Sequence, residues 1–131
     1  MTTLLIVVGP GAGDPDGLFR ELAERGKYQV RFASGPAAAE AGLRAWPVAL
    51  LVAAPGVSTA DVSHLLSSKV ALRPGIPVLV IRNRQAEEPA AWARKGVGVL
   101  RCPLLPEALS RSVDVVLGLP AAAPGGERSR R

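Results

Sequence analysis

Leu4-Leu5-Ile6-Val7-Val8 is the stretch that decides the fold, because its apolar residues follow one another without a polar interruption. Further apolar runs occur at residues 48–52, 78–81 and 97–100. Short runs of this kind, rich in β-branched side chains, are typical of strands that are buried on both faces of a sheet. Residues 28–32 alternate polar and apolar side chains instead, which predicts a more exposed strand.

Helical patterns separate these predicted strands. The first begins at Leu18 and repeats apolar residues at spacings of three and four, with charged residues between them. Asp14 or Asp16 is placed to cap this helix, and Gly26 is placed to end it. Further helices are predicted at residues 36–45, from a cap at Ser58 or Thr59 to before Pro74, at 89–95 and at 106–117. Strands that alternate with helices in this way predict a parallel sheet with helices on both faces.

The composition fits a single folded domain of 131 residues with an aliphatic core, since 48% of the residues are hydrophobic and only 4% are aromatic. One cysteine excludes a disulfide framework within the chain, and one histidine excludes most multi-histidine metal sites. No apolar run approaches the roughly 18 residues of a membrane span. The run Leu4–Val8 is too short for a signal peptide and has no basic leader, so we expect a cytoplasmic protein without membrane contact.

The charge is distributed unevenly between the predicted domain, residues 1–118, and the Pro/Gly/Arg-rich segment 119–131, which we expect to be a flexible tail or linker. The net charge is +5, and the tail contributes to it through Arg128, Arg130 and Arg131 against Glu127. In the rest of the chain the basic residues are scattered singly. Nucleic-acid binders usually cluster them on one face, so direct nucleic-acid binding is not expected.

The order and spacing of four groups of residues carry a family resemblance. The groups are Gly26-Lys27-Tyr28-Gln29-Val30 with Ala33-Ser34-Gly35, Leu50-Leu51 with Pro55-Gly56, Leu72-Arg73-Pro74-Gly75-Ile76-Pro77-Val78-Leu79-Val80-Ile81, and Gly96 with Val99-Leu100-Arg101-Cys102-Pro103-Leu104. From Thr3 to Gly118 the chain resembles a bacterial response-regulator receiver domain of two-component signalling. The resemblance implies a three-layer, flavodoxin-like α/β fold with five parallel strands in the order 2-1-3-4-5. It also implies a cis bond between Cys102 and Pro103.

The resemblance implies a phosphorylation pocket at the carboxyl edge of the sheet, and this sequence departs from it at every position. The family places an acidic pair after the first strand, an Asp nucleophile after the third, a Thr or Ser after the fourth and a Lys after the fifth. The matching positions here are Gly9 and Pro10, then Leu51, Val52 or Ala53, then Arg82, and then Cys102. Without carboxylates there is neither a nucleophile nor an oxygen cage for Mg²⁺. The sequence therefore predicts a degenerate receiver with no bound metal or cofactor and no enzymatic activity, which signals independently of phosphorylation.

The resemblance further implies that contact with a protein partner, or with a second copy of the chain, involves the fourth helix, fifth strand and fifth helix. The residues expected there are Trp92, Val99, Leu105, Leu109 and Val113, and packing in the core is an equal alternative for Trp92. Val99 stands where the family has an aromatic switch residue. The apolar stripe of the last helix exceeds what the sheet is expected to cover, which favours such an interface.

An alternative function arises from Gly9-Pro10-Gly11-Ala12-Gly13-Asp14-Pro15, which follows the first strand and precedes a helix, as phosphate-binding turns do. This segment resembles the opening loop of tetrapyrrole methyltransferases that use S-adenosylmethionine. Gly11, Gly13 and Arg82 would then bind a small anion or a nucleotide in a ligand-sensing domain. The competing interpretations are a flexible turn and an Arg82 that points into solvent. Cys102 is either a small residue that fills space or a reactive thiol near Arg82 and Arg101.

Overall fold

Five parallel strands form one sheet in the computed structural model, which describes residues 2–9, 17–25, 28–83, 89–94 and 96–118. The strands are β1 (Thr2–Val8), β2 (Tyr28–Ser34), β3 (Val48–Ala53), β4 (Val78–Arg82) and β5 (Gly98–Arg101). Their order in the sheet is β2-β1-β3-β4-β5, with every pair parallel. The predicted fold class and strand order are therefore confirmed.

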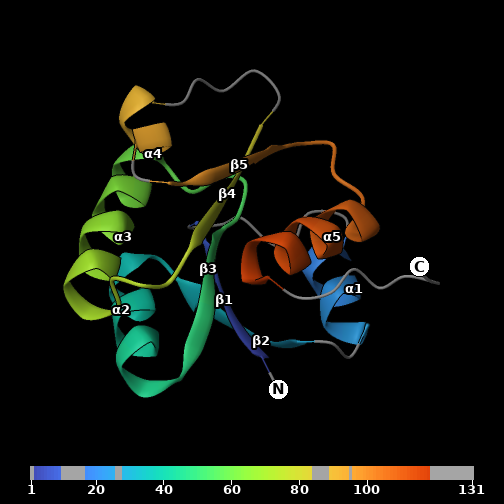
Figure 1. The fold of residues 1–131 in the computed structure, drawn as a ribbon, viewed down its shortest axis with the longest axis horizontal. Helices are drawn as coiled ribbons and strands as arrows, with labels where there is room; N and C mark the ends of the chain where they lie inside the picture. The colour runs from blue at the N-terminus through green and yellow to red at the C-terminus, as the bar shows by residue number, and fades with distance from the viewer. Residues whose placement is uncertain (1, 10–16, 26–27, 84–88, 95, 119–131) are drawn as a thin grey trace.

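The helices cover both faces of this sheet (Figure 1). They are α1 (Leu18–Glu24), α2 (Pro36–Ala45), α3 (Thr59–Leu72), α4 (Ala90–Arg94) and α5 (Pro106–Leu117). One core cluster joins the sheet to α2, α3 and α4, and a second joins the opposite face to α1 and α5. None of the helices in the described part of the chain has the length and hydrophobicity needed to span a bilayer.

Local sequence explains most of the helix boundaries. The Ser58 side chain caps α3 by accepting a hydrogen bond from the Asp61 backbone N–H at 3.0 Å. Pro106 opens α5 and Gly118 ends it in the left-handed region, with φ at 71°. Gly17 occupies the N-cap position of α1, and the predicted caps Asp14 and Asp16 lie outside the described residues.

The two edge strands differ from the central ones in burial. Strand β2 has buried and exposed residues mixed along its length, as its alternating sequence predicts. Strand β5 was expected to be buried on both faces, but all of its residues are only half-buried. The reason is its place at the other edge of the sheet, where β4 is its sole neighbour. By contrast, Val78 to Ile81 in β4 are all buried.

Several predicted features lie outside the described residues. These are the helix-ending Gly26, Lys95 at the end of the fourth helix, and the segment 119–131 that was expected to be a tail.

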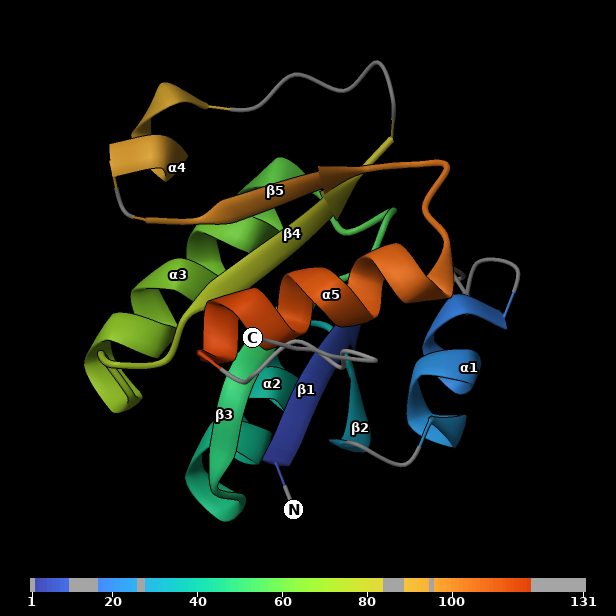
Figure 2. The same cartoon turned by 45° about the vertical axis from the view of Figure 1, so that its right-hand side comes forward.

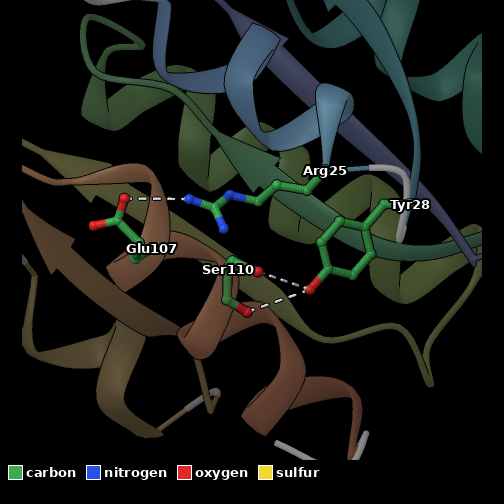
Figure 3. A network of polar contacts seen from close by, with 4 residues as sticks. All are labelled: Arg25, Tyr28, Glu107 and Ser110. Carbon is green, nitrogen blue, oxygen red and sulfur yellow. Dashed lines mark hydrogen bonds and ion pairs between the residues drawn. The ribbon is translucent and has the colours of Figure 1, made fainter. Parts of the chain in front are cut away.

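A buried polar cluster joins α5 to the start of β2. The Tyr28 hydroxyl donates a hydrogen bond to the Asp114 carboxylate, and both residues are 3% exposed. The same hydroxyl lies 3.3 Å from the backbone carbonyl oxygen of Ser110 and 3.4 Å from its Oγ (Figure 3). Nearby, Arg25 and Glu107 form an ion pair of 3.2 Å with far more exposed side chains. The tyrosine contacts join α5 to the start of β2, and the ion pair joins α5 to the end of α1.

We expect Tyr28→Phe to lower the free energy of unfolding by about 1–3 kcal/mol, because the buried Asp114 loses the tyrosine donor. The matched change Arg25→Ala should cost less than about 1 kcal/mol, because an exposed ion pair is screened by solvent. Urea denaturation followed by circular dichroism measures both values. Equal losses in the two variants would contradict the assigned difference between the contacts.

Candidate functional site

The carboxyl ends of the parallel strands meet at one edge of the sheet, which is where ligands of open α/β sheets usually bind. Gly9 follows β1, Ala54 follows β3, Asn83 follows β4 and Cys102 follows β5. The structure therefore brings together, at this edge, four of the segments in which the sequence predicts a degenerate phosphorylation pocket. Pro10, Gly11 and Gly13, which also belong to that prediction, lie outside the described residues.

Gly9 is in direct contact with the loop that follows β3. A Cβ atom added to Gly9 would lie 2.8 Å from the carbonyl oxygen of Gly56, closer than real Cβ atoms approach a neighbour. The same two segments are joined by a hydrogen bond of 2.9 Å from the Ala54 N–H to the Val7 carbonyl oxygen. Backbone therefore fills the space that a side chain at position 9 would need, and a carboxylate does not fit there.

The end of β3 is lined by small apolar side chains. Ala53 is the last residue of the strand and pairs with Val7 of β1 and Val80 of β4. Leu51 and Val52 lie within the strand and are fully buried, so of the three predicted positions Ala53 is the one at the edge. Among the residues that the structure describes, no group of His, Cys, Asp and Glu side chains could hold a metal ion.

Arg82 ends β4 and contacts two helices. Its Nη2 donates a hydrogen bond of 3.2 Å to Thr59 Oγ1 at the start of α3, and its Cζ lies 5.2 Å from the ring centre of Trp92 in α4. The alternative that Arg82 simply points into solvent is therefore wrong, and the residue is half-buried. Arg82 lines a pocket of about 210 Å³ together with Ser58, Thr59 and Asn83.

Cys102 occupies the turn after β5 and is half-buried. Its N–H donates a hydrogen bond of 2.9 Å to the Arg82 carbonyl oxygen, and the residue packs against the core cluster of α1 and α5. This placement agrees with the interpretation of Cys102 as a small residue that fills space. The bond between Cys102 and Pro103 is cis, as the resemblance implied.

The residues expected at an interface are corrected in part. Trp92 is 2% exposed, and Leu109 and Val113 are fully buried, so these three belong to the core. Trp92 belongs to the core cluster on the face of the sheet that carries α2 and α3, whereas Leu109 and Val113 form the stripe by which α5 covers the opposite face. Val99 is half-buried and Leu105 is 67% exposed, so only these two remain accessible to a partner.

Two exposed valines of α5 were not among the residues predicted for the interface. Val115 is 78% exposed and Val116 is 36% exposed. The signal available was the run Val113-Asp114-Val115-Val116, whose apolar arc is wider than one helix face needs. Val116 belongs to the apolar stripe predicted for the last helix, and Val115 lies beside that stripe.

Comparison with known proteins finds solved structures that are similar to this chain. No protein-family model matches the sequence, and no curated protein matches it significantly. A CheY-like response regulator receiver domain from Methanospirillum hungatei matches with a TM-score of 0.72 and 17% identity, over 90% of this chain and 95% of that one. NtrX from Brucella abortus matches with a TM-score of 0.73 and 20% identity, over 90% of this chain and 26% of that one. The chain thus spans about a quarter of NtrX.

A third similar structure is the lysine decarboxylase LdcF from Francisella novicida, with a TM-score of 0.69 and 10% identity over 89% of this chain and 17% of that one. At these levels of identity the comparisons establish the fold of receiver domains. Because an enzyme contains a domain of the same fold, the function must be argued from the site.

We expect Gly9→Ala to lower the free energy of unfolding by about 1–3 kcal/mol, because the added methyl group meets the Gly56 carbonyl. The control is Gly75→Ala, where an added Cβ meets nothing within 4 Å, and which should be neutral or slightly stabilising. Thermal and urea denaturation measure both changes. An unaltered stability of Gly9→Ala would contradict the close approach of the two loops.

Proposed function

We propose that the chain is a receiver-like regulatory module that acts through contact with a protein partner and does not depend on phosphorylation. The observation that carries this proposal is the contact of the Gly9 backbone with the Gly56 carbonyl. It occupies the position at which the receiver resemblance requires a metal-binding carboxylate.

The chemistry of the surrounding residues supports the same conclusion. Receiver phosphorylation needs a carboxylate nucleophile and oxygen ligands for Mg²⁺. Here β3 ends in Ala53, which has no nucleophilic group. Arg82 brings a positive charge to this edge and is held there by Thr59 and Trp92. That charge repels a divalent cation.

The distribution of the other acidic groups supports a regulatory role over a catalytic one. Asp114 is buried against Tyr28, and Glu107 is paired with Arg25, so both carboxylates of α5 stabilise the position of that helix. Leu105, Val115 and Val116 instead leave apolar surface exposed on the same helix and at its start. Exposed apolar side chains at both ends of one helix favour contact with another protein.

The proposal predicts that acetyl phosphate and Mg²⁺ leave the chain unmodified in intact-mass spectrometry. A receiver domain that retains the acidic residues is the positive control under the same conditions. Detection of a stable phosphoryl adduct on this chain would overturn the proposal. Loss of that adduct in an Asp14→Asn, Asp16→Asn double variant would then assign the missing carboxylates to the segment after β1.

The ligand-sensing alternative is supported by the polar pocket of about 210 Å³ beside Arg82, at the start of α3. A thermal-shift titration with inorganic phosphate, ATP and S-adenosylmethionine separates the two functions, because a ligand that binds only the folded state raises Tm. The regulatory module should show no shift. A concentration-dependent rise that Arg82→Gln removes would favour the sensor instead.

A further inference from the structure

Strand β2 forms one edge of the sheet, and β1 is its only neighbour among the described strands. The two strands pair residue by residue over all seven positions, from Tyr28 to Ser34, without a bulge. Figure 2 shows β2 at the end of the sheet opposite to β5, with α1 beside it. An edge strand presents a row of backbone N–H and C=O groups that can pair with a further strand. The outer edge of β2 is therefore a potential docking surface.

This edge lacks most of the features that keep other strands away. Natural sheets usually protect an edge with a proline, a lysine, a bulge or a very short strand. Strand β2 is seven residues long, has the sequence Tyr-Gln-Val-Arg-Phe-Ala-Ser and contains none of these. Its only charged residue is Arg31. That charge disfavours an added strand with positive charges on the same face and leaves an acidic strand free to pair.

On the face that carries α1, β2 exposes an aromatic ring. Phe32 is 51% exposed, although its ring meets that of Phe19 edge to face, with 6.3 Å between the ring centres. Phe32 lines a hollow of about 630 Å³ together with Gly17, Arg20 and Ala23. Glu24 follows Arg20 by one helical turn, so the charges on this side of α1 balance. The hollow therefore fits an apolar side chain better than a charged one.

The opposite face of β2 carries a positive charge that is held in place. The Arg31 guanidinium lies over the Trp46 ring, with Cζ 4.5 Å from the ring centre. The N–H donors of a stacked guanidinium lie in its own plane and can still bind a carboxylate. Within the described part of the chain, no carboxylate pairs with Arg31. Glu40 of α2 instead accepts a hydrogen bond of 2.8 Å from Ser68 Oγ, which turns it toward α3.

The two faces of β2 select among the possible occupants of its edge. A second copy that paired through its own β2 about a two-fold axis would place both Arg31 side chains on the same face of the joined sheet, where like charges repel. An extended segment with carboxylates on that face would attract Arg31 instead. Because side chains of a strand alternate between its faces, the same segment can place apolar side chains beside Phe32.

We infer that the outer edge of β2 binds an extended segment of a partner protein as a sixth strand, whose apolar side chains face Phe32 and whose carboxylates face Arg31. Backbone hydrogen bonds along the edge would supply affinity, and the alternating side chains would supply specificity. The contact is separate from the exposed valines of α5, which line a groove beside β5 at the other edge. It extends the proposed function to a second surface and rests on it only for the class of partner, a protein.

The binding test uses the full chain and three fluorescein-labelled peptides of about nine residues, long enough to pair along a strand. Valine and glutamate alternate in the first peptide. The second has lysine in place of glutamate, and the third has the same valines and glutamates in two separate blocks. Fluorescence anisotropy at neutral pH should show that the first peptide binds at least about tenfold more tightly than either control, because only it combines carboxylates on one face with apolar side chains on the other. No binding of the first peptide, or equal binding of a control peptide, would overturn the inference.

Hydrogen exchange distinguishes an added strand from a contact made through side chains alone. The outward-facing amides of β2 should exchange at least about tenfold more slowly with saturating alternating peptide, because each then donates to the peptide backbone. Nuclear magnetic resonance of the labelled chain measures these rates, and the amides of β5 at the other edge are the internal control. Unchanged exchange in β2 with the peptide bound would contradict strand addition. Slow exchange already in the free monomer would show that another segment of the chain occupies the edge, which would equally overturn the inference.

Variants on the two faces of β2 locate the contact. Arg31→Glu should invert the preference between the alternating glutamate and lysine peptides, and the milder Arg31→Gln should weaken the glutamate peptide at least about fivefold. The matched control is Arg111→Glu, which makes the same change of charge at an exposed arginine of α5 and should leave the preference unchanged. Circular dichroism verifies that each variant is folded. The same inversion in the Arg111 variant would assign the preference to net charge and refute a contact at β2.

Phe32→Ala should weaken the alternating peptide at least about fivefold, because it removes the apolar contact on the α1 face. Its control is Leu105→Ala at a residue that is 67% exposed, which should have no effect on binding. Equal losses in the two variants would place the apolar contact elsewhere and overturn the inference.

A dimer in sedimentation equilibrium that Phe32→Ala dissociates would make a second copy the occupant, and the inference would then be wrong. None of these measurements contains a phosphodonor. Their failure is therefore distinguishable from the phosphoryl adduct that would overturn the proposed function.

Discussion

An all-parallel sheet must be shielded from water on both faces, and the rest of this structure depends on that requirement. Along β1 and β3, successive side chains enter opposite cores, with Leu5 and Leu51 under α2 and α3, and Leu4 and Leu50 under α1 and α5. Each fully buried leucine contributes roughly 2 kcal/mol relative to an exposed one. Because the aromatic content is only 4%, these interlocking aliphatic side chains provide most of the stabilisation.

The helices cover the two faces of the sheet unequally, and the polar contacts of α5 explain which strand is left partly open. Tyr28 begins β2, at one edge of the sheet, and its hydroxyl contacts Ser110 and Asp114 in α5. Arg25 and Glu107 join the end of α1 to the first turn of the same helix. These contacts hold α5 on the β2 side, which leaves the face of β5 at the opposite edge partly open. A groove of about 300 Å³, lined by Leu79, Leu100 and Val115, lies on this side of α5, and the buried hydrogen-bond cluster contributes no side chain to it.

The sequence showed which residues replace those of a receiver's phosphorylation pocket. It did not show how the replacing residues are arranged in space. The residue types at Gly9, Arg82 and Cys102 already showed that the receiver chemistry was absent from those positions. Only the folded chain shows that Gly9 is a glycine because the Gly56 carbonyl lies against it. Arg82 likewise meets Thr59, which lies 23 residues earlier. Contacts between residues so far apart depend on how the strands and loops are arranged, and no local pattern encodes that arrangement.

The sequence by itself determined the order of strands and helices, because hydrophobic periodicity, proline and glycine act over a few neighbouring residues. It predicted α2 and α5 with the bounds that the structure has, each opened by a proline. Only the tertiary structure decided which side of α5 would be buried. Leu109 and Val113, expected at an interface, are in the core, and Val115 is exposed. A helical pattern gives the spacing of an apolar arc, but the direction in which that arc turns depends on the elements that pack against it.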